Sequence, residues 1–136
     1  MINSNYIFSA PIAVLTTGLK VANFSSPHAF IFSDGTILPA CDESRSRSLS
    51  LQSSEVLTKR NGWQDVDISF TLDFLCLAEL SKYQDFNGVV IVPRLVLDAI
   101  KYHNQNDSIK INENNFRTCR LFDRITKVVC IDKFCK

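Results

Sequence analysis

The fold is decided by the stretch Trp63-Gln-Asp-Val-Asp-Ile-Ser-Phe-Thr-Leu-Asp-Phe-Leu-Cys-Leu-Ala-Glu-Leu80, within which the hydrophobic period changes. Over Trp63–Leu72 apolar and polar residues alternate, which predicts a strand with one face in the core. From Thr71 to about Gln84 the spacing becomes helical, with Thr71 suited to the N-cap and Asp73 to the first turn. The residues at helical spacing are Phe74, Leu77, Ala78 and Ser81.

Hairpins are predicted on the N-terminal side of this stretch. Asp34-Gly35 and Asn61-Gly62 each lie between runs of strand-forming residues. Such pairs favour tight turns because glycine tolerates a positive φ. The polar segment Pro39–Ser48 between the hairpins has room for a short helical turn. The expected strands here are Ile12–Thr17, Leu19–Asn23, His28–Phe32, Ile37–Leu38 and Glu55–Lys59.

On the C-terminal side, Val89–Val92 is a continuous apolar run, which predicts a strand buried on both faces. Pro93 can begin a helix, because the first helical position needs no N–H. The residues on one face of that helix are Val96, Ala99, Ile100 and His103. A polar loop at Asn104–Asn115 leads to a last hairpin with strands Arg117–Asp123 and Thr126–Asp132.

These elements predict one α+β domain over residues 1–136, with a mostly antiparallel sheet of about six to eight strands and two helices. A chain of 136 residues is the usual size of one domain with one core. No run approaches the ~20 apolar residues of a membrane span. The first residues lack the features of a signal peptide, so we expect a cytosolic protein without membrane contact.

The charge of the chain is uneven. The formal net charge is +1, yet residues 110–136 carry seven bases and three acids, a local net charge of +4. The first 109 residues carry eight bases and eleven acids, a net charge of −3. A basic end on a mildly acidic body predicts a local anion site. The overall excess is too small for a protein that binds nucleic acid polymers.

Residues that commonly carry chemistry are scattered. The five cysteines are an odd number without a framework spacing, so we expect reduced, structural thiols. His28 and His103 have no cysteine or acid at metal-ligand spacing. Phosphate-binding glycine loops and the nucleophile-elbow pattern are missing from the sequence. We therefore expect no metal, no cofactor and no enzymatic activity, and a protein that works by binding.

The last hairpin carries the most informative pattern. Strand alternation places Arg120, Phe122 and Arg124 on one face together with Thr118. Two guanidinium groups around an aromatic ring suit a nucleotide, because the ring can stack a base and arginine can bind phosphate with paired donors. The alternative is an ordinary solvated strand face on which Asp123 pairs with an arginine.

A second candidate is the segment Asn23-Phe-Ser-Ser26, which precedes Pro27. Asn23 and the two serines offer hydrogen bonds beside the ring of Phe24, so the segment could line a pocket. The alternative is a plain connection between two strands.

The chain resembles the Thoeris anti-defence sponge proteins of phages. The similarity lies in Leu19-Lys-Val-Ala-Asn-Phe-Ser-Ser-Pro-His-Ala-Phe30, in Asp34-Gly-Thr-Ile-Leu-Pro-Ala-Cys41, and in Phe116-Arg-Thr-Cys-Arg-Leu-Phe-Asp-Arg-Ile-Thr-Lys127 with Phe134-Cys135. It covers most of the chain, and Asn104–Asn115 is its least certain part. The resemblance implies a homodimer or higher homo-oligomer in the cytoplasm of the infected bacterial host.

The resemblance also implies a ligand and a site. Such sponges bind cyclic ADP-ribose isomers and keep them intact, and some members also hold cyclic oligonucleotides at a separate site. Arginines of the C-terminal hairpin and an aromatic residue of the N-terminal half contribute to the pocket. The residues that the resemblance assigns here are Arg120, Arg124, Phe24, Asn23, Arg117, Asp123, Arg60 and Asn104.

Two other functions remain open at this point. An enzyme that degrades the same signal would need a general base, for which Asp123 and His28 are the candidates. A protein-binding inhibitor of a bacterial defence component would need no small ligand.

Overall fold

The computed structural model describes residues 9–136, and its largest sheet has five strands and is called the central sheet below. Strands β1 and β2 pair antiparallel, β2–β7 and β7–β8 pair parallel, and β8–β9 pair antiparallel. In sheet order the strands are β1 (Ile12–Val14), β2 (Lys20–Asn23), β7 (Val89–Ile91), β8 (Phe116–Asp123) and β9 (Val128–Cys135).

The α+β class is therefore confirmed, but the expected mostly antiparallel arrangement is wrong for the central sheet. The sheet is mixed because two connections return to it through helices, which lets neighbouring strands run in the same direction. The connection from β2 to β7 contains α1 (Glu43–Ser48) and α2 (Phe74–Tyr83). The connection from β7 to β8 contains α3 (Arg94–Asn106). The described part of the chain thus has three helices where two were expected.

A small hairpin covers one face of the sheet. It consists of β3 (Phe30–Ile31) and β4 (Ile37–Leu38), joined by the predicted Asp34-Gly35 turn. A parallel bridge from Phe32 to Val129 joins β3 to β9, and β4 contacts β1 and β2. The sheet consequently curls around the apolar side chains on this face. These residues include Leu15, Val21, Phe32, Leu38, Ile91 and Val129.

The helices cover the opposite face of the sheet. Neighbouring residues of one strand face the two cores, as Val21 and Ala22 do in β2, because strand side chains alternate. The helical core includes Ala22, Cys76, Leu80, Val90, Leu97, Ile100 and Phe116. Val89–Ile91 is thereby buried on both faces, as predicted.

Helix α2 differs in detail from the prediction. Its N-cap is Asp73, whose side chain accepts a hydrogen bond from the Cys76 N–H, and Thr71 ends the preceding strand. Phe74 is 87% exposed, whereas Cys76, Glu79 and Leu80 are buried. The buried face of α2 therefore lies at Cys76, Glu79 and Leu80 and not at the expected spacing that begins with Phe74. Helix α3 begins after Pro93 and buries Val96, Ala99 and Ile100, as predicted.

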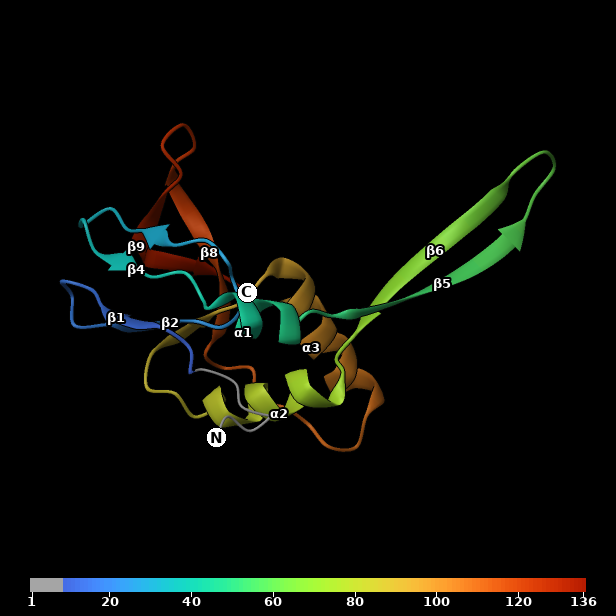
Figure 1. Cartoon of the computed structure of the whole chain (residues 1–136), viewed down its shortest axis with the longest axis horizontal. Coiled ribbons are helices and arrows are strands. Elements are labelled where there is room, and N and C mark those ends of the chain that lie inside the picture. The colour runs from blue at the N-terminus through green and yellow to red at the C-terminus, as the bar shows by residue number, and fades with distance from the viewer. Residues whose placement is uncertain (1–8) are drawn as a thin grey trace.

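The remaining hairpin, which we call the arm, consists of β5 (Gln52–Lys59) and β6 (Gln64–Thr71). It projects away from the rest of the molecule (Figure 1). The predicted turn and alternation are both confirmed, but the predicted burial is wrong. Ile68 is 56% exposed, and Val66 is exposed as well. No described helix is long and apolar enough to cross a membrane.

Candidate functional site

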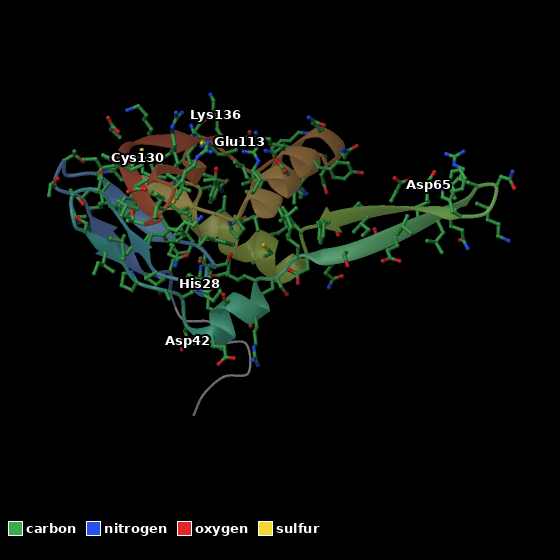
Figure 2. All side chains as sticks on the ribbon, turned by 90° about the horizontal axis from the view of Figure 1, so that it is seen from above. His28, Asp42, Asp65, Glu113, Cys130 and Lys136 are labelled. Atoms are coloured by element: carbon green, nitrogen blue, oxygen red, sulfur yellow. The ribbon has the colours of Figure 1, made fainter. Side chains whose placement is uncertain are left out.

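The last hairpin carries an open hollow, which we call the β8–β9 hollow. Its volume is about 460 Å3, within the range of roughly 300–1,000 Å3 usual for small-molecule sites. It is lined by Ser33, Arg120, Leu121, Phe122, Cys130, Asp132 and Lys133. Figure 2 shows Cys130 on the body of the molecule and Asp65 far out on the arm.

The irregular pairing of β8 with β9 shapes this hollow. The register shifts between Cys119 and Leu121 and again between Leu121 and Asp123. Strict alternation would separate Leu121 from Arg120 and Phe122, yet all three line the hollow. Ser33 reaches the hollow because its N–H donates to the Val129 carbonyl at 2.8 Å.

The hollow combines positive charge with an aromatic surface. Arg120 and Lys133 are both exposed, and Phe122 is 60% exposed. Lys133 pairs with Asp132 at 3.3 Å, whereas no carboxylate within residues 9–136 pairs with Arg120. An exposed ring beside an unpaired guanidinium can stack a base and bind a phosphate.

Arg124 and Asp123 have different positions from Arg120. Arg124 lies in the turn one residue beyond β8 and does not line the hollow. Asp123 accepts a hydrogen bond from the Ile125 N–H at 2.9 Å, and this bond lowers the pKa of the carboxyl. Asp123 therefore stabilises the turn, and it is a poor general base at neutral pH.

Arg117 lines another hollow, of about 380 Å3, between β8 and α3. Its guanidinium donates to the backbone carbonyls of Glu113 at 3.1 Å and Phe116 at 2.8 Å. Lys101 and Lys136 line the same hollow. The structure therefore does not place Arg117 and Arg120 in one site.

The structure corrects the expected roles of Asn23 and Phe24. Both residues are fully buried. The Phe24 ring lies 5.4 Å from the guanidinium carbon of Arg45 and makes an edge contact with Tyr83, so it is not available to stack a base. The Asn23 amide donates to backbone carbonyls of Ser26 and Pro39 and holds the following loop.

Arg60 and Asn104 also lie apart from the hollow. Arg60 is in the turn of the arm and pairs with Asp65 at 2.7 Å. Asn104, in α3, donates to the Ile111 carbonyl at 2.7 Å and accepts from the Ile111 N–H at 2.7 Å. These two bonds fix the polar loop that follows α3.

The thiols and histidines do not form a reactive cluster in the described chain. Burial raises the pKa of Cys119 and of Cys76 to about 12, so both thiols stay protonated. His103 contacts the Ile109 carbonyl through Nε2 at 2.8 Å. No group of three potential metal ligands occurs within residues 9–136.

Sequence reasoning missed several important residues. Arg45 and Glu79 form a buried ion pair at 2.7 Å, and Arg45 also donates to the Phe24 carbonyl at 2.8 Å. Glu79 is a charged residue at the helical spacing of an apolar face. That position was the sequence signal for a buried carboxylate with a charged partner. Ser33 in the hollow comes from a distant segment, which the sequence could not bring next to the last hairpin, and Lys133 lies on β9 one residue beyond the strand predicted to end at Asp132.

Comparison with known proteins adds no further relationship. No protein-family model, no curated protein and no solved structure matches the chain significantly.

Proposed function

We propose that the protein binds a cyclic nucleotide immune signal in the β8–β9 hollow and sequesters it without cleaving it. The signal would be a cyclic ADP-ribose isomer, and a cyclic oligonucleotide could bind elsewhere on the protein. The proposed role is that of a phage anti-defence protein in the cytoplasm of the infected host, acting as a homodimer or higher homo-oligomer. The observation that supports it is the grouping of Arg120, Phe122 and Lys133 around one hollow.

The chemistry of the hollow suits this ligand. A cyclic ADP-ribose isomer presents two phosphates and an adenine. Arg120 and Lys133 can bind the phosphates, and Phe122 supplies a ring for the base. An effective sponge needs nanomolar affinity, about −12 kcal/mol. Charge-assisted hydrogen bonds of ~1.5–3 kcal/mol each and stacking of ~1–3 kcal/mol can reach this value in a preorganised site.

The surroundings of the hollow favour binding over cleavage. Asp132, which lines the hollow, pairs with Lys133 at 3.3 Å. Asp123, the acid expected as a candidate general base, does not line the hollow and already accepts a backbone hydrogen bond that lowers the pKa of its carboxyl. The half-buried thiol of Cys119, on β8 but outside the lining of the hollow, stays protonated at neutral pH, because burial raises its pKa to about 12. Neither Asp123 nor Cys119 is therefore suited to remove a proton from an attacking water at neutral pH.

The direct test is recovery of the ligand. Purified protein is incubated with a cyclic ADP-ribose isomer, freed of unbound ligand and denatured by heat, and the supernatant is analysed by chromatography. The proposal predicts intact ligand in stoichiometric amount. Cleaved product would identify an enzyme instead, and recovery no higher than with an unrelated protein would remove the proposed ligand.

Variants locate the site in the same assay. Arg120→Ala and Phe122→Ala should each lose most of the recovered ligand while keeping the thermal unfolding of the wild type, because both side chains are exposed. Arg117→Ala is the matched control from the other hollow on β8 and should retain the ligand.

A further inference from the structure

The arm leaves an apolar face uncovered. Opposed residues in an antiparallel pair share one face, so the pairing of Leu57 with Val66, of Glu55 with Ile68 and of Ser53 with Phe70 defines that face. Leu57, Val66 and Ile68 are all exposed on it. The other face of the arm is polar apart from Val56.

A projecting hairpin with an uncovered apolar face has little stability of its own. A two-stranded hairpin alone is marginally stable in water, and a third layer is needed to bury its apolar face. The contacts of the arm with the body within residues 9–136 are made at its base, where β6 meets α3. Apolar and polar residues alternate strictly along β6 although the body does not cover its apolar face. This combination therefore indicates that another molecule packs against that face.

The apolar face continues into the body at the base of the arm. Phe70 lines two hollows beside α3, of about 240 Å3 and about 390 Å3, and Leu95 lines both of them. Leu95 is itself exposed, as is Tyr102 at the edge of the smaller hollow. The arm and these hollows form one apolar surface, which we call the arm surface.

We infer that the arm surface is a dimerisation surface, on which the arms of two copies of this chain pack face to face in opposite directions. The proposal rests on the homo-oligomer of the proposed function and deepens it by naming the surface and its mode of pairing, and it does not depend on any ligand.

Charge complementarity supports a second copy as the partner. Glu55 and Lys59 lie on the apolar face, two residues before and two residues after Leu57. A two-fold axis through the centre of the arms at Leu57 therefore places Glu55 of each copy over Lys59 of the other. Such an arrangement repeats the same favourable contact twice, as a two-fold interface requires.

The distances from Leu57 to the two ends of the arm also match. Phe70 lies opposite Ser53, four residues from Leu57, and the turn of the arm lies four residues from Leu57 in the other direction. The same axis thus brings the turn of each arm over the hollows at the base of its partner. An arm of eight residues is about 26 Å long, which gives the pair of arms a shared face that includes both bases.

The test is the solution mass of the full chain without ligand, measured by light scattering during size-exclusion chromatography. The wild type should have an even multiple of the mass of one chain. Leu57→Glu should halve that mass, because it places a charge in the centre of the face. Val56→Glu is the matched control: Val56 is 61% exposed and Leu57 59% exposed, but Val56 lies on the polar face.

Exchanging the charges of Glu55 and Lys59 tests how the two arms pair, and it removes no apolar contact. Glu55→Lys and Lys59→Glu should each weaken dimerisation at least about tenfold, and the double variant should restore it. A monomeric wild type, an unchanged mass for Leu57→Glu, or an equal loss for Val56→Glu would each overturn the proposal. Since these measurements contain no nucleotide, their failure is distinct from failure of the proposed ligand.

Discussion

The β5–β6 and β8–β9 hairpins have strands of the same length, but only the β8–β9 hairpin packs into the cores of the molecule. Every strand in the two hairpins is eight residues long. Hairpin β8–β9 lies at the edge of the central sheet and buries Phe116 and Val129 in the two cores. Hairpin β5–β6 stands out from the body with its apolar face exposed. An alternating pattern specifies which residues share a face, but not whether the same chain covers that face.

The largest expected effect separates the buried start of β8 from its exposed end. Phe116→Ala should lower the free energy of unfolding by about 3–5 kcal/mol, because the ring is fully buried against the helices. Phe122→Ala, on the same strand but exposed, should change it by less than about 0.5 kcal/mol. Urea titration checks both variants, and similar losses would contradict the described burial of β8.

Two glycines sharpen the comparison between body and arm. Gly88 precedes β7, and a Cβ there would lie 2.2 Å from the Lys20 carbonyl oxygen of β2. Gly88→Ala should therefore cost about 3 kcal/mol, since overpacking and backbone strain add. Gly62 in the turn of the arm has a φ of +91° but open space around it, so Gly62→Ala should cost about 1–2 kcal/mol from the backbone alone.

Thermal unfolding of both glycine variants supplies the measurement. The Gly88 variant should melt at the lower temperature by a clear margin. Equal melting temperatures would mean that the close approach of β2 to the segment before β7 does not constrain the fold.

Shortening the arm should affect assembly far more than folding. Replacing residues 56–67 with Asn-Gly connects Glu55 through a two-residue turn to Ile68, which lies opposite it. The shortened chain should fold, with a stability change of no more than about 1 kcal/mol, because few contacts with the body are lost. Circular dichroism and light scattering should report a folded protein that has lost its dimer. An unfolded product would show that the arm stabilises the body.

The smallest expected effect concerns acid. Asp34 accepts hydrogen bonds from the Thr16 N–H at 2.8 Å and the Thr36 N–H at 2.9 Å, and these bonds hold the pKa of its carboxyl well below the ordinary value. A lowered pKa in the folded state means that this stabilisation is complete above about pH 4 and is lost as the pH falls toward the folded pKa.

Melting temperatures of Asp34→Asn and the wild type measure this effect. The variant should be less stable at neutral pH, and the difference should shrink below about pH 4. The exposed Asp67 on the arm is the control, and Asp67→Asn should leave the melting temperature unchanged. A difference for Asp34→Asn that is constant with pH would contradict the hydrogen-bonded carboxylate.

Much of the fold could be predicted because its signals are local. Neighbouring residues predict the turns at Asp34-Gly35 and Asn61-Gly62, the apolar run of β7 and the start of α3 at Pro93. The parallel pairing of β2 with β7 depends on long connections, which local patterns do not describe. The polar run Pro39–Ser48 has room for a short helical turn, and the structure has the six-residue helix α1 there, capped by Asp42.

The candidate site was harder to predict. Arg120 and Phe122 share a hollow as their spacing indicated, whereas Arg124 falls in the turn because β8 ends at Asp123. Phe24 was assigned to the site by resemblance, yet it is a core residue. Ser33 enters the hollow through the bridge between Phe32 and Val129, a tertiary contact without a local sequence signal, whereas Lys133 belongs to β9, the partner strand of β8.

The most direct test of the proposed site compares one arginine from each hairpin. Wild type, Arg120→Ala and Arg60→Ala are titrated with a cyclic ADP-ribose isomer in a calorimeter. Loss of a charge-assisted bond of ~1.5–3 kcal/mol should weaken binding by Arg120→Ala roughly 10- to 150-fold, while Arg60→Ala binds like the wild type. Equal affinity of the wild type and Arg120→Ala, or a loss only with Arg60→Ala, would contradict a binding site in the β8–β9 hollow.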